Sequence, residues 1–479
     1  GLLVAIGLLF SNNRKKVSWP LVVKGLLIQL FFAIFIIHSE ALRSIFFPLG
    51  WIKDLVSGLG QGVVKLLDFI QIGSEFVFGS LATPAGTKGS MGFFFAFQVL
   101  PTILFFAALT SVLYYLGILQ AIVKFMAKVM SKLLGTSGAE SLSNTANIFI
   151  GQTEAPILIK PYIGSMTRSE LLTIMVGGMA TVAGGVLATY IQILGEAMTA
   201  LKDIDYLTVA ETVKTLPLIP FGTEIGQGLI EAKGLYHTFA LKGAKVNFAV
   251  HLITASVMAA PASLVISKIL YPETEVPKTK GTVKLKVEQT ASNVIEAAAT
   301  GTSEGLKLAL NVGAMLLVFI AMINFINFIL ISVGGLEVFG LPSLNALIAD
   351  SYGPSQKLSM EFLLGIVLKY LGIGIGIPAK DALHFGSLFG TKIVVNEFLA
   401  YVNLVEMIKA GTLSSKTIIM STFALCGFAN FSSIAIQIGG ISPMAPHRKK
   451  DLASLGLKAV LGGALATLMC ATLAGVLIT

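Results

Sequence analysis

Long apolar segments alternate with short polar connections along almost the whole chain. Apolar stretches that are long enough to cross a membrane, or nearly so, fall at about 1–10, 20–38, 97–120, 171–194, 246–271, 306–334, 417–440 and 453–478. This pattern predicts about eight transmembrane helices. No stretch between them has the composition of a separate soluble domain, so we expect an all-α integral membrane protein.

The composition supports this prediction and excludes several other classes of protein. Of 479 residues, 55% are hydrophobic and 12% are charged, which is about half the charged share of an average soluble domain. Both cysteines lie in apolar segments, so no disulfide framework is expected. The five histidines lack the close spacing of zinc sites. The net charge of +9 is better explained by loops that face an anionic lipid leaflet than by binding to nucleic acid.

Charged residues assign the connections to the two sides of the membrane. Arginines and lysines gather at residues 14–16, 160–168, 278–286 and 448–450, and these loops should be cytoplasmic. The segment 195–243 carries six acids against four lysines, so it should face outward. The short N-terminus and the lack of a long tail predict a multi-pass protein of a bacterial inner (plasma) membrane.

A polar cluster at residues 147–156, NIFIGQTEAP, does not fit a simple spanning helix. The cytoplasmic loops on both sides require the segment 121–170 to return to the side from which it entered. Gly151 and Pro156 flank the polar residues and break the helix. We therefore predict a re-entrant hairpin around 138–165. Because irregular backbone at membrane depth must be buried in protein or line a cavity, its polar tip predicts a binding site.

The second half of the chain contains corresponding breaks. A string of glycines and a proline at 372–378 predicts a second re-entrant hairpin around 358–390, and its GIGIG sequence does not fit a nucleotide loop because no βαβ pattern surrounds it. The spans 171–194 and 417–440 should also be broken. Such pairs indicate a transporter with inverted repeats and a site at the membrane midplane. We divide the chain into an N-terminal part, 1–96, with an interfacial helix near 52–73, and two halves, 97–272 and 273–479.

Specific motifs resemble one known family of transporters. GQTEAP, KPYIGSMTRSE, GGMATVAGGVLATYI, SVMAAP, NEFLAY, CGFANFSSIAIQIGG and PHRKKDLASLGLKAV occur in this order. The combination resembles the concentrative nucleoside transporters from about residue 97 to the C-terminus. The segment 195–243 departs from the family, which usually has a shorter connection there. The resemblance implies a homotrimer that imports nucleosides by alternating access, with two re-entrant hairpins and two broken helices in each protomer.

The resemblance also implies which residues bind the substrate. The tip of the first hairpin would contact the nucleobase, and the NEF and GFANFSS motifs would hold the ribose. The candidate substrate residues are Gln152, Thr153, Glu154, Val186, Glu397, Phe428, Asn430 and Ser433. An amide can match the adjacent donors and acceptors of a base edge, and a carboxylate can accept hydrogen bonds from the ribose hydroxyls.

The family resemblance further implies a co-transported ion. In sodium-coupled members the ion (Na⁺) lies between the first hairpin tip and the broken helix that follows. The matching ligands are the side chains of Asn147 and Thr181 and the backbone carbonyls of Ile150 and Val182. Neutral oxygens suit a small hard cation. Coupling to protons, carried by Glu154 or Glu397, is the alternative.

Each candidate residue also has a purely structural interpretation. Glu154 could satisfy backbone amides of the hairpin, and Glu397 could pair with Lys392. Asn430 and Ser433 could join helices by hydrogen bonds, and Phe428 alone could be a core aromatic. An enzyme that uses the two glutamates as an acid and a base is disfavoured, because no nucleophile with its own base is evident. A channel would not need paired broken helices.

Overall fold

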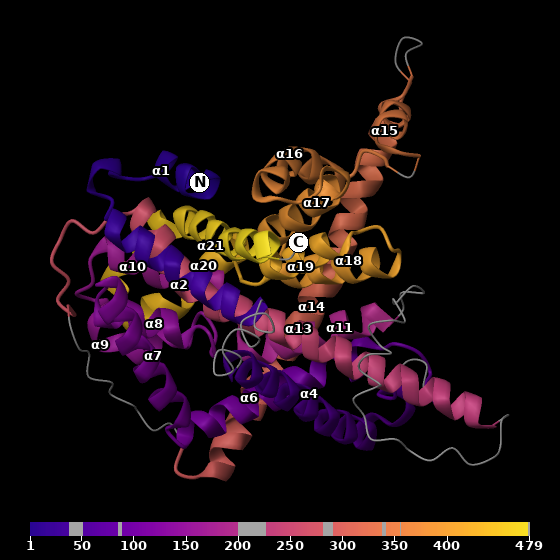
Figure 1. Cartoon of the computed structure of the whole chain (residues 1–479), viewed down its shortest axis with the longest axis horizontal. Coiled ribbons are helices and arrows are strands. Elements are labelled where there is room, and N and C mark those ends of the chain that lie inside the picture. The colour runs from indigo at the N-terminus through magenta and orange to yellow at the C-terminus, as the bar shows by residue number, and fades with distance from the viewer. Residues whose placement is uncertain are drawn as a thin grey trace.

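The computed structural model describes residues 1–37, 51–84, 89–199, 227–280, 291–337, 342–354 and 356–477. Within these ranges the chain is entirely helical and contains no β-strand (Figure 1). The N-terminal part forms α1 (Leu2–Leu9), α2 (Trp19–Ile37) and α4 (Trp51–Phe78). The first half forms α5 (Phe95–Gln98), α6 (Leu100–Tyr115), α7 (Ile118–Leu134), α8 (Gly138–Ala146), α9 (Lys160–Ile163), α10 (Arg168–Ala180), α11 (Gly184–Thr199) and α13 (Gln227–Leu270). The second half forms α14 (Val294–Gly334), α15 (Leu344–Tyr352), α16 (Met360–Ile375), α17 (Ala382–Val394), α18 (Glu397–Lys409), α19 (Ser415–Leu425), α20 (Phe431–Ile441) and α21 (Lys449–Leu477).

Six helical segments of the described chain are long and apolar enough to cross a membrane. They are Asp54–Leu81, Phe95–Tyr115, Arg168–Gly195, Ala244–Leu270, Val294–Gly334 and Pro446–Leu477. Five of them coincide with spans predicted from the sequence. The sixth segment contains most of α4. The sequence predicted an interfacial helix near 52–73 here, which covers fewer residues. The interfacial position of this helix stays a prediction. The predicted span at 1–10 forms the eight-residue helix α1, and the span at 20–38 forms α2, whose apolar segment Trp19–Phe35 is shorter than the six above. The predicted span at 417–440 forms two helices separated by a break.

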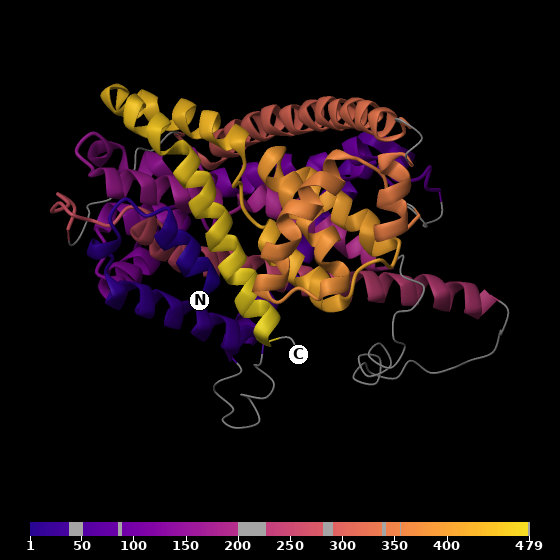
Figure 2. The ribbon, with the colours of Figure 1, turned by 90° about the horizontal axis from the view of Figure 1, so that it is seen from above.

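Helix α14 lies along one long edge of the molecule, and α2 lies on the opposite side (Figure 2). Only 11% of the apolar window of α14 is buried within the chain, whereas 83% is buried in the windows at 168–195 and 244–270. The buried helices α10, α13 and α21 pack against one another in the centre. The polar breaks in the chain are therefore surrounded by packed helices.

The first hairpin begins with α8, whose start is fixed by a capping box. Ser137 Oγ accepts a hydrogen bond from the Glu140 amide, and the Ser137 amide donates to Glu140 Oε1 at 2.7 Å. The other oxygen of Glu140 lies 2.7 Å from Lys268 Nζ on α13, and both side chains are buried. The chain turns at residues 147–154 and returns through a short 3₁₀ helix, Ala155–Ile159, and α9. The helix therefore breaks at the predicted polar cluster.

Two helices are interrupted where polar residues were found in apolar segments. The first interruption separates α10 from α11 at residues 181–183, and the second separates α19 from α20 at residues 426–430. Gly184 N–H donates to Phe149 O at 3.3 Å, which joins the first interruption to the tip of the first hairpin. Gly427, in the second interruption, lies against the carbonyl of Ala180 at the end of α10. The two interruptions and the hairpin tip thus meet.

A second break occurs at the predicted position, 372–378, and the helices on either side of it, α16 and α17, pack against each other. The glycine string does end a helix: Gly376 has a φ of 104°, and Ile377 N–H donates to Gly372 O at 3.0 Å, as in a Schellman cap. However, the cavity described below is not lined by this turn. It is lined by the next break, where Val395 ends α17 and Asn396 caps α18. The hairpin that reaches the site is thus α17–α18, at 382–409, and the glycines mark only the preceding turn.

The acidic segment predicted to face outward, 195–243, lies mostly outside the described residues. Its end belongs to α13, which begins at Gln227, earlier than the predicted span at 246–271. The division into halves and the outward position of the segment remain predictions.

Candidate functional site

A cavity of about 190 Å³ lies where the hairpin tips and the broken helices meet. Its lining includes all eight candidate substrate residues: Gln152, Thr153, Glu154, Val186, Glu397, Phe428, Asn430 and Ser433. They come from four separate parts of the chain, namely the first hairpin tip, α11, the start of α18 and the α19–α20 break. The fold thus brings together residues that are nearly 300 positions apart in the sequence.

One side of the cavity is an amide cluster centred on Gln152. Its Nε2 donates a hydrogen bond to Ser433 Oγ at 3.3 Å, and its Oε1 accepts one from Gln437 Nε2 at 3.0 Å. Gln437 Nε2 also donates to the backbone carbonyl of Met175 on α10 at 3.0 Å. The side chain of Gln152 is therefore held in one orientation, while the carboxylate of Glu154 lies beside Gly151 at the more exposed part of the tip.

A second part of the cavity lining is built around the buried carboxylate of Glu397. Tyr190 donates its hydroxyl to Glu397 Oε1 at 3.0 Å, and Asn430 Nδ2 donates to Oε2 at 3.1 Å. The Oδ1 of Asn430 caps α20 by accepting from the Ser433 amide at 2.8 Å. Glu397 also occupies the first position of α18, where the positive end of the helix dipole favours a carboxylate. Its charge is compensated by two donors and a helix terminus.

The structural alternatives for these residues can be compared with the geometry. Lys392 forms no ion pair with Glu397 within the described part of the chain; its ammonium donates to Ala424 O and Thr467 Oγ1 instead. Asn430 does join two elements, as the structural alternative supposed, and it does so at the cavity wall. The two interpretations of Asn430 therefore describe one arrangement.

Apolar side chains complete the lining of the cavity. Val186 on α11 and Phe428 in the α19–α20 break line it, as the sequence predicted. Four further wall residues come from α14 and were not predicted: Leu308, Val312, Met315 and Leu316. A flat apolar ring could pack against this wall while the polar groups of the lining fix its orientation.

The four candidate ion ligands lie on the two segments that the Gly184–Phe149 hydrogen bond joins. Asn147, Ile150, Thr181 and Val182 are all buried. Asn147 Oδ1 is buried and accepts no hydrogen bond from any residue that the structure describes. Thr181 Oγ1 donates to Gly177 O at 2.9 Å, which leaves its lone pairs able to accept. An unpaired buried oxygen costs about 1–3 kcal/mol, so a cation at this place would satisfy an otherwise unfavourable group.

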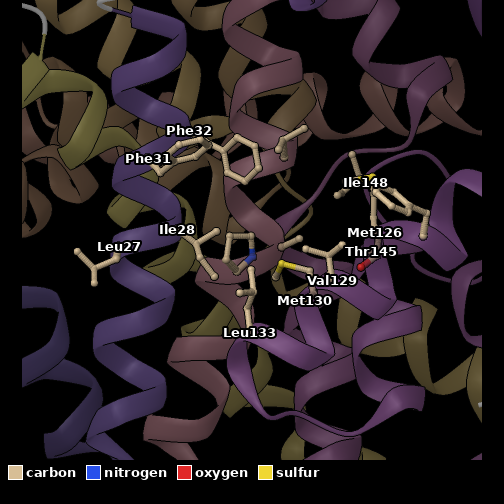
Figure 3. A pocket seen from close by; sticks show the side chains of 14 residues that line it. Leu27, Ile28, Phe31, Phe32, Met126, Val129, Met130, Leu133, Thr145 and Ile148 are labelled. Carbon is tan, nitrogen blue, oxygen red and sulfur yellow. The ribbon is translucent and has the colours of Figure 1, made fainter. Parts of the chain in front are cut away.

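A larger cavity, of about 460 Å³, lies elsewhere, between α2, α7, α8 and α13 (Figure 3). Of the 14 side chains that line it, Thr145 is the only polar one. Such a surface cannot match the donors and acceptors of a base or a sugar. Size alone therefore does not select a site, and the smaller cavity that contains the candidate residues is the one considered further.

Three features of the site escaped the sequence prediction. Tyr190 and Gln437 are long side chains in helices whose composition is mainly apolar, and each was available as a polar residue within a predicted broken span. Reading the hydrogen-bonding capacity of every polar residue in those spans would have selected both. The α14 wall has no such signal, since its leucines and valines resemble those of any membrane helix.

Comparison with protein-family models places the whole architecture in one family. The model described as the N-terminus of Na⁺-dependent nucleoside transporters matches residues 1–81, and the model of their C-terminus matches residues 251–475. A model described as nucleoside recognition matches residues 96–197, which include the first hairpin and the first broken helix.

Individual relatives agree with the family models over nearly full length. An uncharacterized transporter of Haemophilus influenzae is 41% identical over 99% of this chain and 95% of its own. The nucleoside permease NupC of Helicobacter pylori is 36% identical over 99% of this chain and 96% of its own. The solved structure of CNTnw in an inward-facing, substrate-bound state matches with a TM-score of 0.76 and 36% identity, covering 100% of this chain and 97% of that one.

The chain belongs to the concentrative nucleoside transporter family. A substituted form of CNTnw in an outward-facing state matches equally well, with a TM-score of 0.76 and 36% identity, covering 99% of this chain and 95% of that one. This concentrative nucleoside transporter is thus a multi-pass membrane protein and not an enzyme, and its fold is one that is known in both inward- and outward-facing states. The predicted family, fold class and sodium-dependent type of transport are confirmed.

Proposed function

We propose that the protein imports nucleosides together with sodium and that the cavity between the two hairpin tips is the substrate site. The observation that carries this proposal is the arrangement of the cavity, which joins an amide cluster at Gln152 to a compensated carboxylate at Glu397. A nucleoside has a base edge at one end and vicinal hydroxyls at the other. The cavity lining offers polar groups for both parts of such a molecule.

The base is assigned to the first hairpin tip because an amide can both donate and accept. Gln152 is held by Gln437 and Ser433, so it presents its remaining hydrogen-bonding capacity in a fixed direction. Thr153 and Glu154 supply further polar groups beside it, directly or through water. Substrates of the uridine type fit this assignment, since their base edge carries adjacent donors and acceptors.

The ribose is assigned to Glu397 because an ionised carboxylate accepts hydrogen bonds from hydroxyl groups with about twice the strength of a neutral acceptor. Each carboxylate oxygen already accepts one bond, from Tyr190 or Asn430, and retains capacity for another. Phe428 and the α14 wall would cover the sugar and exclude water.

Sodium is assigned to Asn147, Ile150, Thr181 and Val182. The unpaired Oδ1 of Asn147 supports this assignment, as does the absence of a charged side chain from the set. Because residues 147–150 continue directly into the Gln152 cluster, sodium would order the tip that contacts the base. Sodium and nucleoside should therefore increase each other's affinity, and by the same factor.

Uptake of labelled uridine into proteoliposomes tests the proposal. An inward sodium gradient should drive accumulation, whereas equal sodium on both sides should give equilibration only. A proton gradient in sodium-free buffer distinguishes the alternative in which Glu154 or Glu397 carries a proton. Accumulation driven by protons alone would exclude sodium coupling, and no uptake of any nucleoside would exclude the substrate class.

Exchanging Asn147 or Gln152 for alanine should separate the two binding sites. Asn147→Ala should raise the sodium concentration for half-maximal uptake about 10-fold, since a lost ligand costs about 1.4 kcal/mol or more. Gln152→Ala should instead change the order of preference among uridine, cytidine and adenosine and leave the sodium requirement within about 3-fold of the parent. Competition and sodium-activation curves measure both effects. If the two variants shift both properties equally, the ion and base assignments are wrong.

A homotrimer is proposed from the family resemblance and from the exposed apolar surface of α14. Leu317, Phe325 and Phe328 are among its side chains that no other part of the described chain covers. A second protomer could cover part of this face, and lipid would cover the rest. Mass measurement of the detergent-solubilised protein by light scattering tests the oligomeric state.

A further inference from the structure

Lys392 is fully buried in the helix core of the protein, close to the substrate cavity but not in its lining. Its ammonium donates to the backbone carbonyl of Ala424 at 2.7 Å and to Thr467 Oγ1 at 3.0 Å. The ring of Phe389 lies 5.5 Å from the same nitrogen. Both hydrogen-bonding partners are neutral oxygens, which are the ligands that a bound cation such as sodium uses.

The charge of Lys392 has no partner of opposite sign in direct contact. Among the residues that the structure describes, no carboxylate lies within ion-pair distance of its nitrogen; Glu397 interacts with it electrostatically from further away. A buried charge in a membrane protein is costly and usually functional. A lysine that only filled space here could be replaced by an apolar residue at lower cost.

The first repeat has a residue in the equivalent position. Asn144 stands three residues before Asn147, which ends α8, and Lys392 stands three residues before Val395, which ends α17. Asn144 Nδ2 donates to the carbonyl of Thr173 on α10 at 3.3 Å, and its Oδ1 accepts from Ser263 Oγ on α13 at 2.6 Å. Each residue therefore connects the first arm of its hairpin to a carbonyl of the broken helix and a hydroxyl of the helix that follows.

Asn144 and Lys392 differ in charge and in how close to the end of the broken helix each one binds. The carbonyl bound by Asn144 lies eight residues before Thr181, the end of α10, whereas the carbonyl bound by Lys392 lies two residues before Cys426, the end of α19. The last carbonyls of a helix have no intrahelical partner and form the negative end of its dipole. The lysine thus brings a positive charge to the end of α19, directly before the interruption that carries Phe428 and Asn430.

We propose that Lys392 is a tethered cation that occupies, in the second repeat, the position of a bound ion at the end of the broken helix. It is a positioning residue: it holds the end of α19 and compensates Glu397, so that the ribose side of the cavity is formed without a second sodium. This inference rests on the proposed function, because it assigns Glu397 to the substrate.

Lys392→Asn tests the inference, since it gives the second repeat the residue of the first and leaves the oxygens of Ala424 and Thr467 free. At a sodium concentration that saturates the parent, the variant should have a uridine KM about 10-fold higher or more, because the end of α19 is no longer held. Raising sodium should restore KM to within about 3-fold of the parent, with a Hill coefficient for sodium that is higher by about one. Without nucleoside, the melting temperature of the variant should continue to rise at sodium concentrations where that of the parent has levelled off.

Thr467→Val is the matched control, because it removes one hydrogen bond from the same ammonium and keeps the charge. Its Hill coefficient should equal that of the parent. The inference is overturned if Lys392→Asn has the parental KM, or if its raised KM does not respond to sodium. If the variant is too unstable to purify, the melting temperature of the double variant Lys392→Asn/Glu397→Gln is measured instead. The inference is also overturned if this melting temperature does not rise further at sodium concentrations above those that saturate the parent. Absence of sodium-driven uptake by the parent would refute the proposed function instead, so the two failures are distinguishable.

Discussion

Replacing Glu397 with Gln should lower kcat/KM for nucleoside uptake about 100-fold, corresponding to about 2.7 kcal/mol. The carboxylate accepts hydrogen bonds from Tyr190 and Asn430 on its two oxygens and is buried at the start of α18. Glutamine keeps the size but replaces one acceptor oxygen with an NH₂ group. If this group faces Tyr190, the tyrosine hydroxyl has to turn and accept instead of donating, and a ribose hydroxyl loses one acceptor. The variant also loses the charge that strengthens hydrogen bonds from the ribose hydroxyls.

Substrate analogues show whether the loss occurs at the ribose. The parent should discriminate uridine from its 2′,3′-dideoxy analogue strongly, whereas Glu397→Gln should transport the two at similar low rates. Glu406→Gln is a suitable control, since this residue lies on the same helix, is 67% exposed at its side chain and pairs with Lys409. It should leave uptake unchanged. A Glu397→Gln variant with unchanged discrimination would remove the carboxylate from the ribose site.

The polar candidate residues could be selected from the sequence because each is a chemical exception in its segment. Val186 and Phe428 are not exceptions and were selected only through the family motifs. Gln152, Glu397 and Asn430 are polar groups in a chain where polar groups at membrane depth are costly. The family motifs then assigned residues from distant segments to one site, which no local sequence pattern could do. All eight candidates line one cavity because the hairpin tips and helix interruptions meet at one place.

The break in the second half that reaches the cavity could not be predicted, because the glycine content pointed to the turn before it. The turn after α16 needs a left-handed residue, Gly376, and so contains an obvious signal. The break that reaches the cavity needs none, since Val395 ends one helix and the side chain of Asn396 caps the next by accepting from the Leu399 amide at 2.9 Å. In the sequence, a capping residue of this kind cannot be distinguished from any other polar residue.

Tyr190 and Gln437 were missed for a different reason. Each acts on a candidate residue, Tyr190 on Glu397 and Gln437 on Gln152, and the contacts join segments that are 207 and 285 positions apart. The sequence shows which residues are polar but not which of them pair over such distances. Supporting residues of a site are therefore harder to predict than the residues that they support.

Replacing Gly427 with Ala should destabilise the protein by about 2–5 kcal/mol and abolish sodium-driven uptake in most of the purified protein. Gly427 has a φ of 130°, where an L side chain is strained, and it lies where the α19–α20 interruption crosses the end of α10. An added Cβ would lie 2.7 Å from Ala180 O and 2.8 Å from Met179 O. Both atoms belong to backbone, so the clash cannot be relieved by rotating a side chain. The end of α10 would have to move.

That movement should reach the ion site, because Thr181 follows Ala180 directly. Any protein that still folds should therefore require more sodium for half-maximal uptake, in addition to melting at a lower temperature. Gly439→Ala is the matched control: it lies in α20, within the same broken helix, and an added Cβ there meets nothing within 4 Å. Alanine in a helix interior should stabilise this position by up to about 1 kcal/mol. If the two variants have the same melting temperature and the parental sodium dependence of uptake, the contact between the two interruptions does not couple the proposed ion site to the proposed ribose site.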